Sequence, residues 1–426
     1  MLRFAQAKSN IAFMYDSFIL LLAISTLFTI INRKYMKLPA TIGILILGML
    51  LSLGILSTKH INSEVYNSFP HIFKTLDFHD FLMNIILGFL LFAGGLHIDF
   101  KALQNEKWSV FLFAVFGTAI STVFIGFVSF YVFNLLGVHI PLIYCFLFGS
   151  LISPTDPIAV LAIFKEYKIN KSLSIKIEGE SLFNDGIGIV FFVTILSLIK
   201  LGHQNFELKE TLFLFLREAI GGIAFGIALG YFGIFFLRQL KEDPRTAIMV
   251  SLVIVMGGWI IANSLEVSAA LAMVAAGITT GHWLHKREYQ KMHQMINLFW
   301  EIIDEIFNNM LFVLMGLAII LIDPTVVSIP LAISTILIVL LARFVSVAIP
   351  FSLIRQKDHS KRFNRGKVLG VLTWSGLRGA LAFALALSIE HLEHGHLIIF
   401  LTYSVASFSI IVQGLSIGKL VKRWEL

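Results

Sequence analysis

Long runs of apolar residues, separated by short polar or basic segments, follow one another through almost the whole chain. A helix of about 20 apolar residues is long enough to cross the ~30 Å hydrocarbon core of a bilayer. The pattern therefore predicts an all-α polytopic membrane protein with thirteen transmembrane helices. The predicted spans cover residues 14–31, 38–57, 79–97, 108–136, 139–164, 173–200, 211–238, 245–263, 267–284, 297–322, 327–354, 367–389 and 396–419.

The composition agrees with a chain whose main solvent is lipid. Hydrophobic residues make up 57% of the sequence and charged residues only 14%, which is more apolar than a water-soluble surface tolerates. The one cysteine, Cys145, lies in an apolar run, so neither a disulfide framework nor a cysteine metal site is expected within one chain. The net charge of +7 comes from short loop clusters, which favours membrane topology signals over a nucleic-acid partner.

The basic loops also predict an orientation. Most of the 33 lysines and arginines fall on one side of the membrane if the C-terminus is cytoplasmic, as positively charged loops usually do. The N-terminus is then outside. We expect a multi-pass protein of the inner (plasma) membrane, with the clusters at residues 165–176 and 355–367 in the cytoplasm.

Thirteen spans divide into six, one linker and six, and two six-helix units on either side of a single span must have opposite orientations. We therefore predict an inverted repeat, with halves over residues 14–200 and 245–420 joined by the span at 211–238. The whole of residues 1–426 is expected to form a single membrane transport domain, and no soluble regulatory domain is expected after the last span.

Corresponding spans of the two halves carry sequences that interrupt a helix. Span 5 contains Ser-Pro-Thr-Asp-Pro at residues 153–157, and span 12 contains Ser-Gly-Leu-Arg-Gly at residues 375–379. Proline removes a backbone donor and glycine weakens a helix. Inverted-repeat transporters place their site where such discontinuous helices meet near the middle of the membrane. The two interruptions therefore predict the location of a binding site.

Span 6 carries polar residues where the bilayer should allow few. Ser181 and Asp185 are four residues apart on a helix, with Asn184 beside them, so their oxygens project from one face. Oxygen ligands suit small hard cations. A buried carboxylate loses its hydration and needs a compensating partner, which is either a proton or a cation. Competition of the two for Asp185 would amount to cation/proton exchange.

Asp156 and Thr155 lie at the interruption of span 5. A new half-helix begins there, and its free N–H groups favour a carboxylate. Thr155 offers a carbonyl and a hydroxyl. For Asp156 the sequence leaves three roles open: a direct cation ligand, a water-mediated ligand, and a helix cap.

Three further charged residues are expected within the membrane. Arg378, in the interruption of span 12, can offset the negative ends of broken half-helices, and its guanidinium does not exchange protons. Glu180 points about 100° away from Ser181 on the helix and is interpreted as structural, neutralised by Arg343 or Arg378.

These segments resemble motifs of the monovalent cation:proton antiporter-1 family, in its prokaryotic sodium/proton exchanger type. The matching segments are residues 153–157, Gly-Glu-Ser-Leu-Phe-Asn-Asp-Gly at 179–186, and Trp-Ser-Gly-Leu-Arg-Gly-Ala at 374–380. They occur in the family's order and extend the resemblance over essentially the whole chain. The resemblance implies a transporter and not an enzyme.

The resemblance also implies a mechanism and a site. The protein is expected to be a homodimer in which a mobile core carries the ion across the membrane as an elevator, with spans 5 and 12 as crossed broken helices. Asp185 then binds the ion and the proton, Asn184 is its paired asparagine, Ser181 and Thr155 are sodium ligands, and Asp156 is a direct or water-mediated ligand. Members with an Asn-Asp pair exchange electroneutrally, so electroneutral exchange of sodium or lithium for protons is expected, without any cofactor.

One position departs from the family pattern, and it leaves the cation preference open. Prokaryotic relatives often carry a glutamate just before a Gly-Gly pair in span 3, whereas this chain has Ala93. Potassium/proton exchange is the alternative, because ligand type alone does not fix cavity size. A passive cation channel and an intramembrane hydrolase are disfavoured, the first by a single deep titratable site and the second by the lack of a paired catalytic base.

Overall fold

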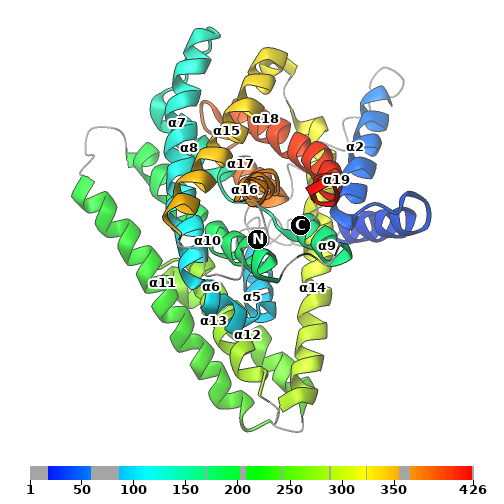
Figure 1. Ribbon diagram of the computed structural model, residues 1–426, viewed down its shortest axis with the longest axis vertical. Helices are drawn as coiled ribbons and strands as arrows, with labels where there is room; N and C mark the ends of the chain where they lie inside the picture. The colour runs from blue at the N-terminus through cyan, green and yellow to red at the C-terminus, as the bar shows by residue number, and fades with distance from the viewer. Residues whose placement is uncertain are drawn as a thin grey trace, which may run out of the picture.

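A computed structural model describes residues 18–58, 86–167, 169, 171–201, 208–240, 243–286, 289–322, 324–354 and 365–424 (Figure 1). In this part of the chain the regular structure is all helical and contains no strand. Nine of its helices are long and apolar enough to cross a membrane, and three shorter apolar helices accompany them. An all-helical polytopic protein is thus confirmed, while the number of thirteen spans and their orientation stay predictions.

Each of the thirteen predicted ranges overlaps a helix, although residues 14–17 and 79–85 lie outside the described residues. The predicted interruptions of spans 5 and 12 are observed. Span 5 is divided into α8 (Leu142–Ile152) and α9 (Ile158–Glu166), and span 12 into α16 (Arg365–Trp374) and α17 (Ala380–Leu387).

The helices form two groups by their packing. The first group, called the site bundle here, comprises residues 100–201 and 329–424 and contains both broken helices. Its remaining elements are α6 (Phe100–Phe111), η3 (Leu112–Gly117), α7 (Thr118–Leu135), α10 (Lys171–Leu201), α15 (Ile329–Leu353), α18 (Gly395–Phe408), η9 (Ser409–Gln413) and α19 (Gly414–Trp424).

The second group, called the outer bundle here, comprises residues 18–58, 86–97 and 208–322 within the described ranges. In it α13 packs on α5 and α11, and α14 packs on α2. Its elements are the helix Phe18–Met36 with its last turn η1 (Asn32–Met36), α2 (Ala40–Thr58), α5 (Leu87–His97), α11 (Leu208–Leu237), α12 (Pro244–Ser264), α13 (Ala269–Leu284), α14 (Gln290–Leu317) and η6 (Ala318–Leu321). In Figure 1, α11 and α14 flank α10 and the α16–α17 pair.

Small residues allow α5 and α13 of the outer bundle to approach each other closely. A Cβ atom added to Gly277 of α13 would lie 2.3 Å from the carbonyl oxygen of Phe92 on α5, and one added to Gly95 would lie 2.5 Å from that of Val274. Only glycine fits such an approach of two backbones, which is the usual way that membrane helices pack tightly.

Capping residues mark where helices begin at the ends of the apolar runs. Asp99 precedes α6, and its side chain accepts a hydrogen bond from the Ala102 N–H at 3.1 Å. Asp243 precedes α12 and accepts from the Arg245 and Thr246 N–H groups, with Pro244 in the first turn. Both are the side-chain N-caps that satisfy otherwise free donors.

Candidate cation-binding site

The two helix interruptions meet in space. The Asp156 N–H donates a hydrogen bond of 2.8 Å to the carbonyl oxygen of Leu377 in the other interruption. A Cβ atom on Gly379 would lie 2.6 Å from the Asp156 carboxylate, so this contact requires a glycine. Proline and glycine interrupt each helix and leave main-chain groups without partners in their own helix. At this crossing, an N–H group of one broken helix bonds to a carbonyl group of the other.

Asp156 lies at the start of α9, as the sequence predicts. Its carboxylate accepts a hydrogen bond of 2.9 Å from the Ile158 N–H. It is only half-buried and faces a cavity, where Asp185 lies as well. The structure therefore shows the capping contact of Asp156 through Oδ1, and no hydrogen bond to its Oδ2 is seen among the described residues.

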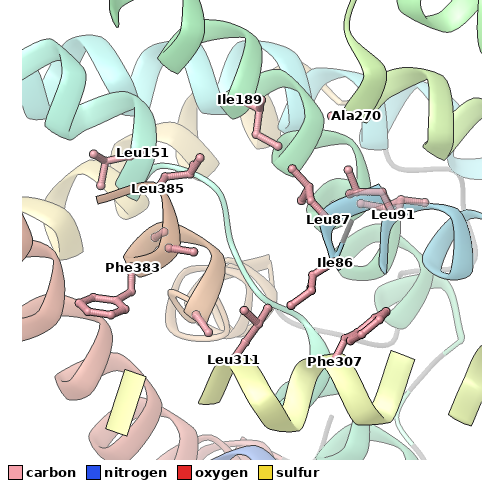
Figure 2. Close-up of a cluster of buried hydrophobic side chains, with 14 of the residues drawn as sticks. Ile86, Leu87, Leu91, Leu151, Ile189, Ala270, Phe307, Leu311, Phe383 and Leu385 are labelled. Atoms are coloured by element: carbon pink, nitrogen blue, oxygen red, sulfur yellow. The ribbon is translucent and has the colours of Figure 1, made fainter. Parts of the chain in front are cut away.

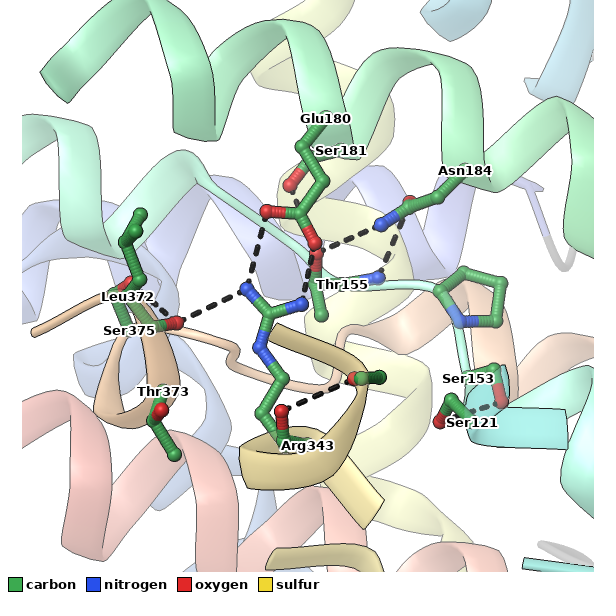
Figure 3. A network of polar contacts seen from close by, with 12 residues as sticks. Ser121, Ser153, Thr155, Glu180, Ser181, Asn184, Arg343, Leu372, Thr373 and Ser375 are labelled. Atoms are coloured by element: carbon green, nitrogen blue, oxygen red, sulfur yellow. Dashed lines mark hydrogen bonds and ion pairs between the residues drawn. The ribbon is translucent and has the colours of Figure 1, made fainter. Parts of the chain in front are cut away.

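Three of the predicted residues form one hydrogen-bonded group (Figure 3). The Thr155 hydroxyl lies 3.0 Å from the Ser181 hydroxyl and accepts a hydrogen bond of 3.0 Å from the Asn184 amide, and the Thr155 N–H donates to the Asn184 carbonyl oxygen at 3.3 Å. All three side chains are buried. Asn184 therefore holds Thr155 by two bonds and fixes the interruption of span 5 against α10.

Of the two predicted residues outside this group, Asp156 has its capping bond and Asp185 has none among the described residues. Asp185 is half-buried. It interacts electrostatically with Asp156. Because two carboxylates that face one cavity repel each other, a proton or cation bound between them is favoured.

The cavity that reaches Asp185 has a volume of about 230 Å³ and lies between the two bundles. The site bundle contributes Asp156, Glu178, Leu182 and Asp185, among others, and α5 and α14 of the outer bundle form the other side. Glu178 lies two helical turns before Asp185, toward the end of α10 that the basic loops predict to be cytoplasmic. The cavity therefore extends along α10 from Asp185 to Glu178.

Glu180 pairs with Arg343. The guanidinium of Arg343 binds both carboxylate oxygens of Glu180, one contact through Nη1 and the other through Nη2 at 3.2 Å. Arg343 also donates to the carbonyl oxygen of Leu372 at 3.0 Å, near the C-terminal end of α16. The sequence left two arginines as partners of Glu180, and the structure distinguishes them.

Arg378 instead binds the end of the other broken helix. Its side chain donates to the carbonyl oxygen of Ser153 and, at 3.1 Å, to that of Pro154, and the residue is 2% exposed. A cation there stabilises the unpaired carbonyl groups at the C-terminal end of α8. Each of the two buried arginines therefore satisfies the end of one half-helix.

Several cavity residues did not emerge from the sequence. Glu178 is followed by Leu182 and Asp185 at helical spacings of four and three, and Asp304 of α14 is followed in the same way by Asn308 and Leu311. His97 of α5 also lines the cavity. The spacing was a usable signal for Glu178, because residues at i, i+4 and i+7 share a helix face.

Ala93 does not face the cavity. Its side chain is fully buried in the apolar core of α5, and Gly94 lines the cavity at this level instead. The residue at position 93 therefore does not form part of the cavity wall in this structure.

Known proteins resemble this chain over nearly its whole length. The family described as "Sodium/hydrogen exchanger, transmembrane" matches residues 19–423. The Na(+)/H(+) antiporter NhaP of Pseudomonas aeruginosa is 39% identical over 412 residues, covering 96% of this chain and 97% of the relative. The Na(+)/H(+) antiporter NhaH of Halobacillus dabanensis is 33% identical over 418 residues, covering 96% and 98%.

A solved structure shares the fold. The sodium proton antiporter MjNhaP1 from Methanocaldococcus jannaschii at pH 8 superposes with a TM-score of 0.77 at 20% sequence identity, covering 97% of this chain and 99% of that one. With the family match over nearly the whole sequence, the similarity in fold and the intramembrane carboxylates lead to one assignment. The chain belongs to the transmembrane sodium/hydrogen exchanger family.

Proposed function

We propose that this protein is a secondary antiporter of the plasma membrane that exchanges sodium ions for protons, with the two cations competing for Asp185. The family consists of transporters, and the relatives that match nearly the whole chain are named Na(+)/H(+) antiporters. The observation that carries the proposal is the half-buried Asp185 carboxylate, which faces a cavity and has no hydrogen-bond partner among the described residues.

Sodium binding uses the oxygen atoms around this carboxylate. Asp185, Ser181, Thr155 and Asp156 supply the ligands, since carboxylate and hydroxyl oxygens suit a hard cation. Asn184 acts on the ion through Thr155, which it holds by two hydrogen bonds. A proton on Asp185 removes the charge that attracts sodium, so one cation leaves when the other binds.

Electroneutral exchange follows from having one exchanging carboxylate. The residue beside Asp185 is the neutral Asn184, and Glu180 is neutralised by Arg343. Asp156 keeps its contact with the Ile158 N–H in this scheme. One proton therefore replaces one sodium ion in each cycle.

An elevator motion is supported by the nature of the boundary between the bundles. Figure 2 shows apolar side chains from both bundles packed together near the cavity. The outer bundle contributes Ile86, Leu87, Leu91, Ala270, Phe307 and Leu311, and the site bundle contributes Leu151, Ile189, Phe383 and Leu385. Contacts without directional bonds allow the site bundle to slide and to carry Asp185 with it.

Assembly and location complete the proposal. The protein functions as a homodimer in the plasma membrane, with apolar side chains such as Val253 and Ile260 of α12 exposed to lipid or to a partner. Crosslinking of cysteines introduced on this face, in native membranes, tests the dimer.

Proton movement in everted membrane vesicles with a preformed pH gradient tests the transport. Sodium, lithium and potassium are added separately to wild type and to Asp185→Asn. We expect sodium or lithium to dissipate the gradient in wild type only, independently of membrane potential. A response to potassium alone would change the substrate to potassium, and an Asp185→Asn variant that exchanges as wild type does would refute the role of Asp185.

A further inference from the structure

The cavity in front of Asp185 has acidic residues on both of its walls, and the two walls belong to different bundles. Asp156, Glu178 and Asp185 lie on the site bundle, whereas Asp304 lies on α14 of the outer bundle. If the site bundle moves during transport, three of these carboxylates move together and Asp304 stays behind.

Asp304 faces the cavity, unlike its acidic neighbours on the same helix. It shares a face of α14 with Asn308 and Leu311, which also line the cavity. Glu301 and Glu305 are exposed and do not line it, and Glu305 pairs with Arg33 at 3.1 Å. Asp304 has no ion pair within the described part of the chain, and it interacts electrostatically with Asp156 across the cavity.

We propose that Asp304 strengthens sodium binding at Asp185 in only one of the two orientations of the transporter, the one in which the site faces this cavity. This inference rests on the proposed exchange at Asp185 and on the proposed movement of the site bundle. Glu178 differs from Asp304 in that it lies on α10 with Asp185 and accompanies the ion in both orientations.

The size of the cavity sets the scale of the effect. For a cavity of about 230 Å³ we take the distance between charges on opposite walls as on the order of 10 Å. At an effective dielectric constant of about 20 to 40, one charge at that distance changes the binding constant of a monovalent cation by about fourfold to sixteenfold. Asp304 therefore makes sodium bind more tightly on the cytoplasmic side than on the outer side.

Vesicles of the two orientations measure this difference. Everted vesicles expose the cytoplasmic face to the bath and right-side-out vesicles expose the outer face. The sodium concentration that gives half of the maximal rate of proton movement is measured in both, at alkaline pH, where few protons compete for Asp185. The main variant is Asp304→Asn. Its control is Glu305→Gln, which removes a negative charge one residue away and outside the cavity.

We expect Asp304→Asn to raise the half-saturating sodium concentration about fourfold or more on the cytoplasmic side and to leave it unchanged on the outer side. Asp304→Glu, which keeps the charge, should remain near wild type. Glu178→Gln should raise the concentration on both sides, and Glu305→Gln on neither. If the Asp304→Asn protein is not recovered in the membrane, Asp304→Ser is used in its place, because it removes the same charge.

Two results would overturn the inference: an equal rise on both sides with Asp304→Asn, or an effect no larger than that of Glu305→Gln. The wild-type and Asp185→Asn vesicles separate this outcome from failure of the proposed function. If wild type shows no sodium-dependent proton movement, the exchange itself is refuted, and the role of Asp304 is refuted with it.

Discussion

Removing the Arg343 guanidinium tests whether the buried ion pair of the site bundle stabilises the fold. The side chains of Arg343 and Glu180 are only 6% and 3% exposed. In Arg343→Met, the Glu180 carboxylate loses both of its contacts, and the carbonyl of Leu372 loses a donor. Breaking one side of a buried pair typically costs about 3–5 kcal/mol, and we expect the free energy of unfolding to fall by that amount.

The partner substitution shows whether the loss comes from the unpaired charge. In the double variant Glu180→Gln/Arg343→Met no charge is left unpaired, so we expect at least about 2 kcal/mol of the loss to be regained. Arg33→Met is the control for a surface pair, because Arg33 and Glu305 are 74% and 47% exposed. Pairs of that kind contribute about 1 kcal/mol or less.

The free energy of unfolding is measured for all four proteins by titration with sodium dodecyl sulfate in mixed micelles. The reasoning is refuted if Arg343→Met loses no more stability than Arg33→Met, or if the double variant is no more stable than Arg343→Met. Either result would mean that water or another group compensates Glu180 where the structure shows Arg343.

Two further predictions concern the helix interruption and a helix start. Gly379→Ala brings a methyl group against the Asp156 carboxylate and should abolish sodium-dependent proton movement in vesicles. Gly257→Ala is the control, because its methyl group meets no atom within 4 Å and should leave the movement intact. Equal activity of the two variants would contradict this prediction. Asp99→Ala removes the cap of α6 and should cost about 1 kcal/mol. The Lys171 ammonium holds the pKa of Asp99 below its usual value of 3.8, so its contribution is present at neutral pH and is lost as the pH falls through that lowered pKa. Unfolding titrations of wild type and variant should therefore converge in acid, and a constant difference at every pH would contradict the assignment.

Local signals made the helix interruptions and the central carboxylate predictable. Proline and glycine act on their own backbone, so residues 153–157 and 375–379 could be identified without knowledge of their neighbours. Asp185 stood out because a charge within an apolar run is costly wherever the helix packs. Ser181 and Asn184, which lie on the same helix as Asp185 and bond to Thr155, followed from helical spacing.

Relations between distant spans could not be predicted in the same way. Arg343 and Arg378 were equivalent partners for Glu180 until their helices were placed, because the sequence does not show which span lies beside α10. Asp304 lies on a helix with two other acidic residues, Glu301 and Glu305, and only the packing of α14 shows which of the three faces the cavity. The division into two bundles likewise depends on contacts between spans.

The bond from the Asp156 N–H to the Leu377 carbonyl joins the two interruptions through main-chain atoms alone. Any residue other than proline at position 156 can donate it, and every residue at position 377 can accept it. The crossing is therefore insensitive to most substitutions at these two positions. Evolution can change the side chains that select the ion while the frame that holds them persists, so exchangers with different cation preferences can descend from one ancestor without rebuilding the fold.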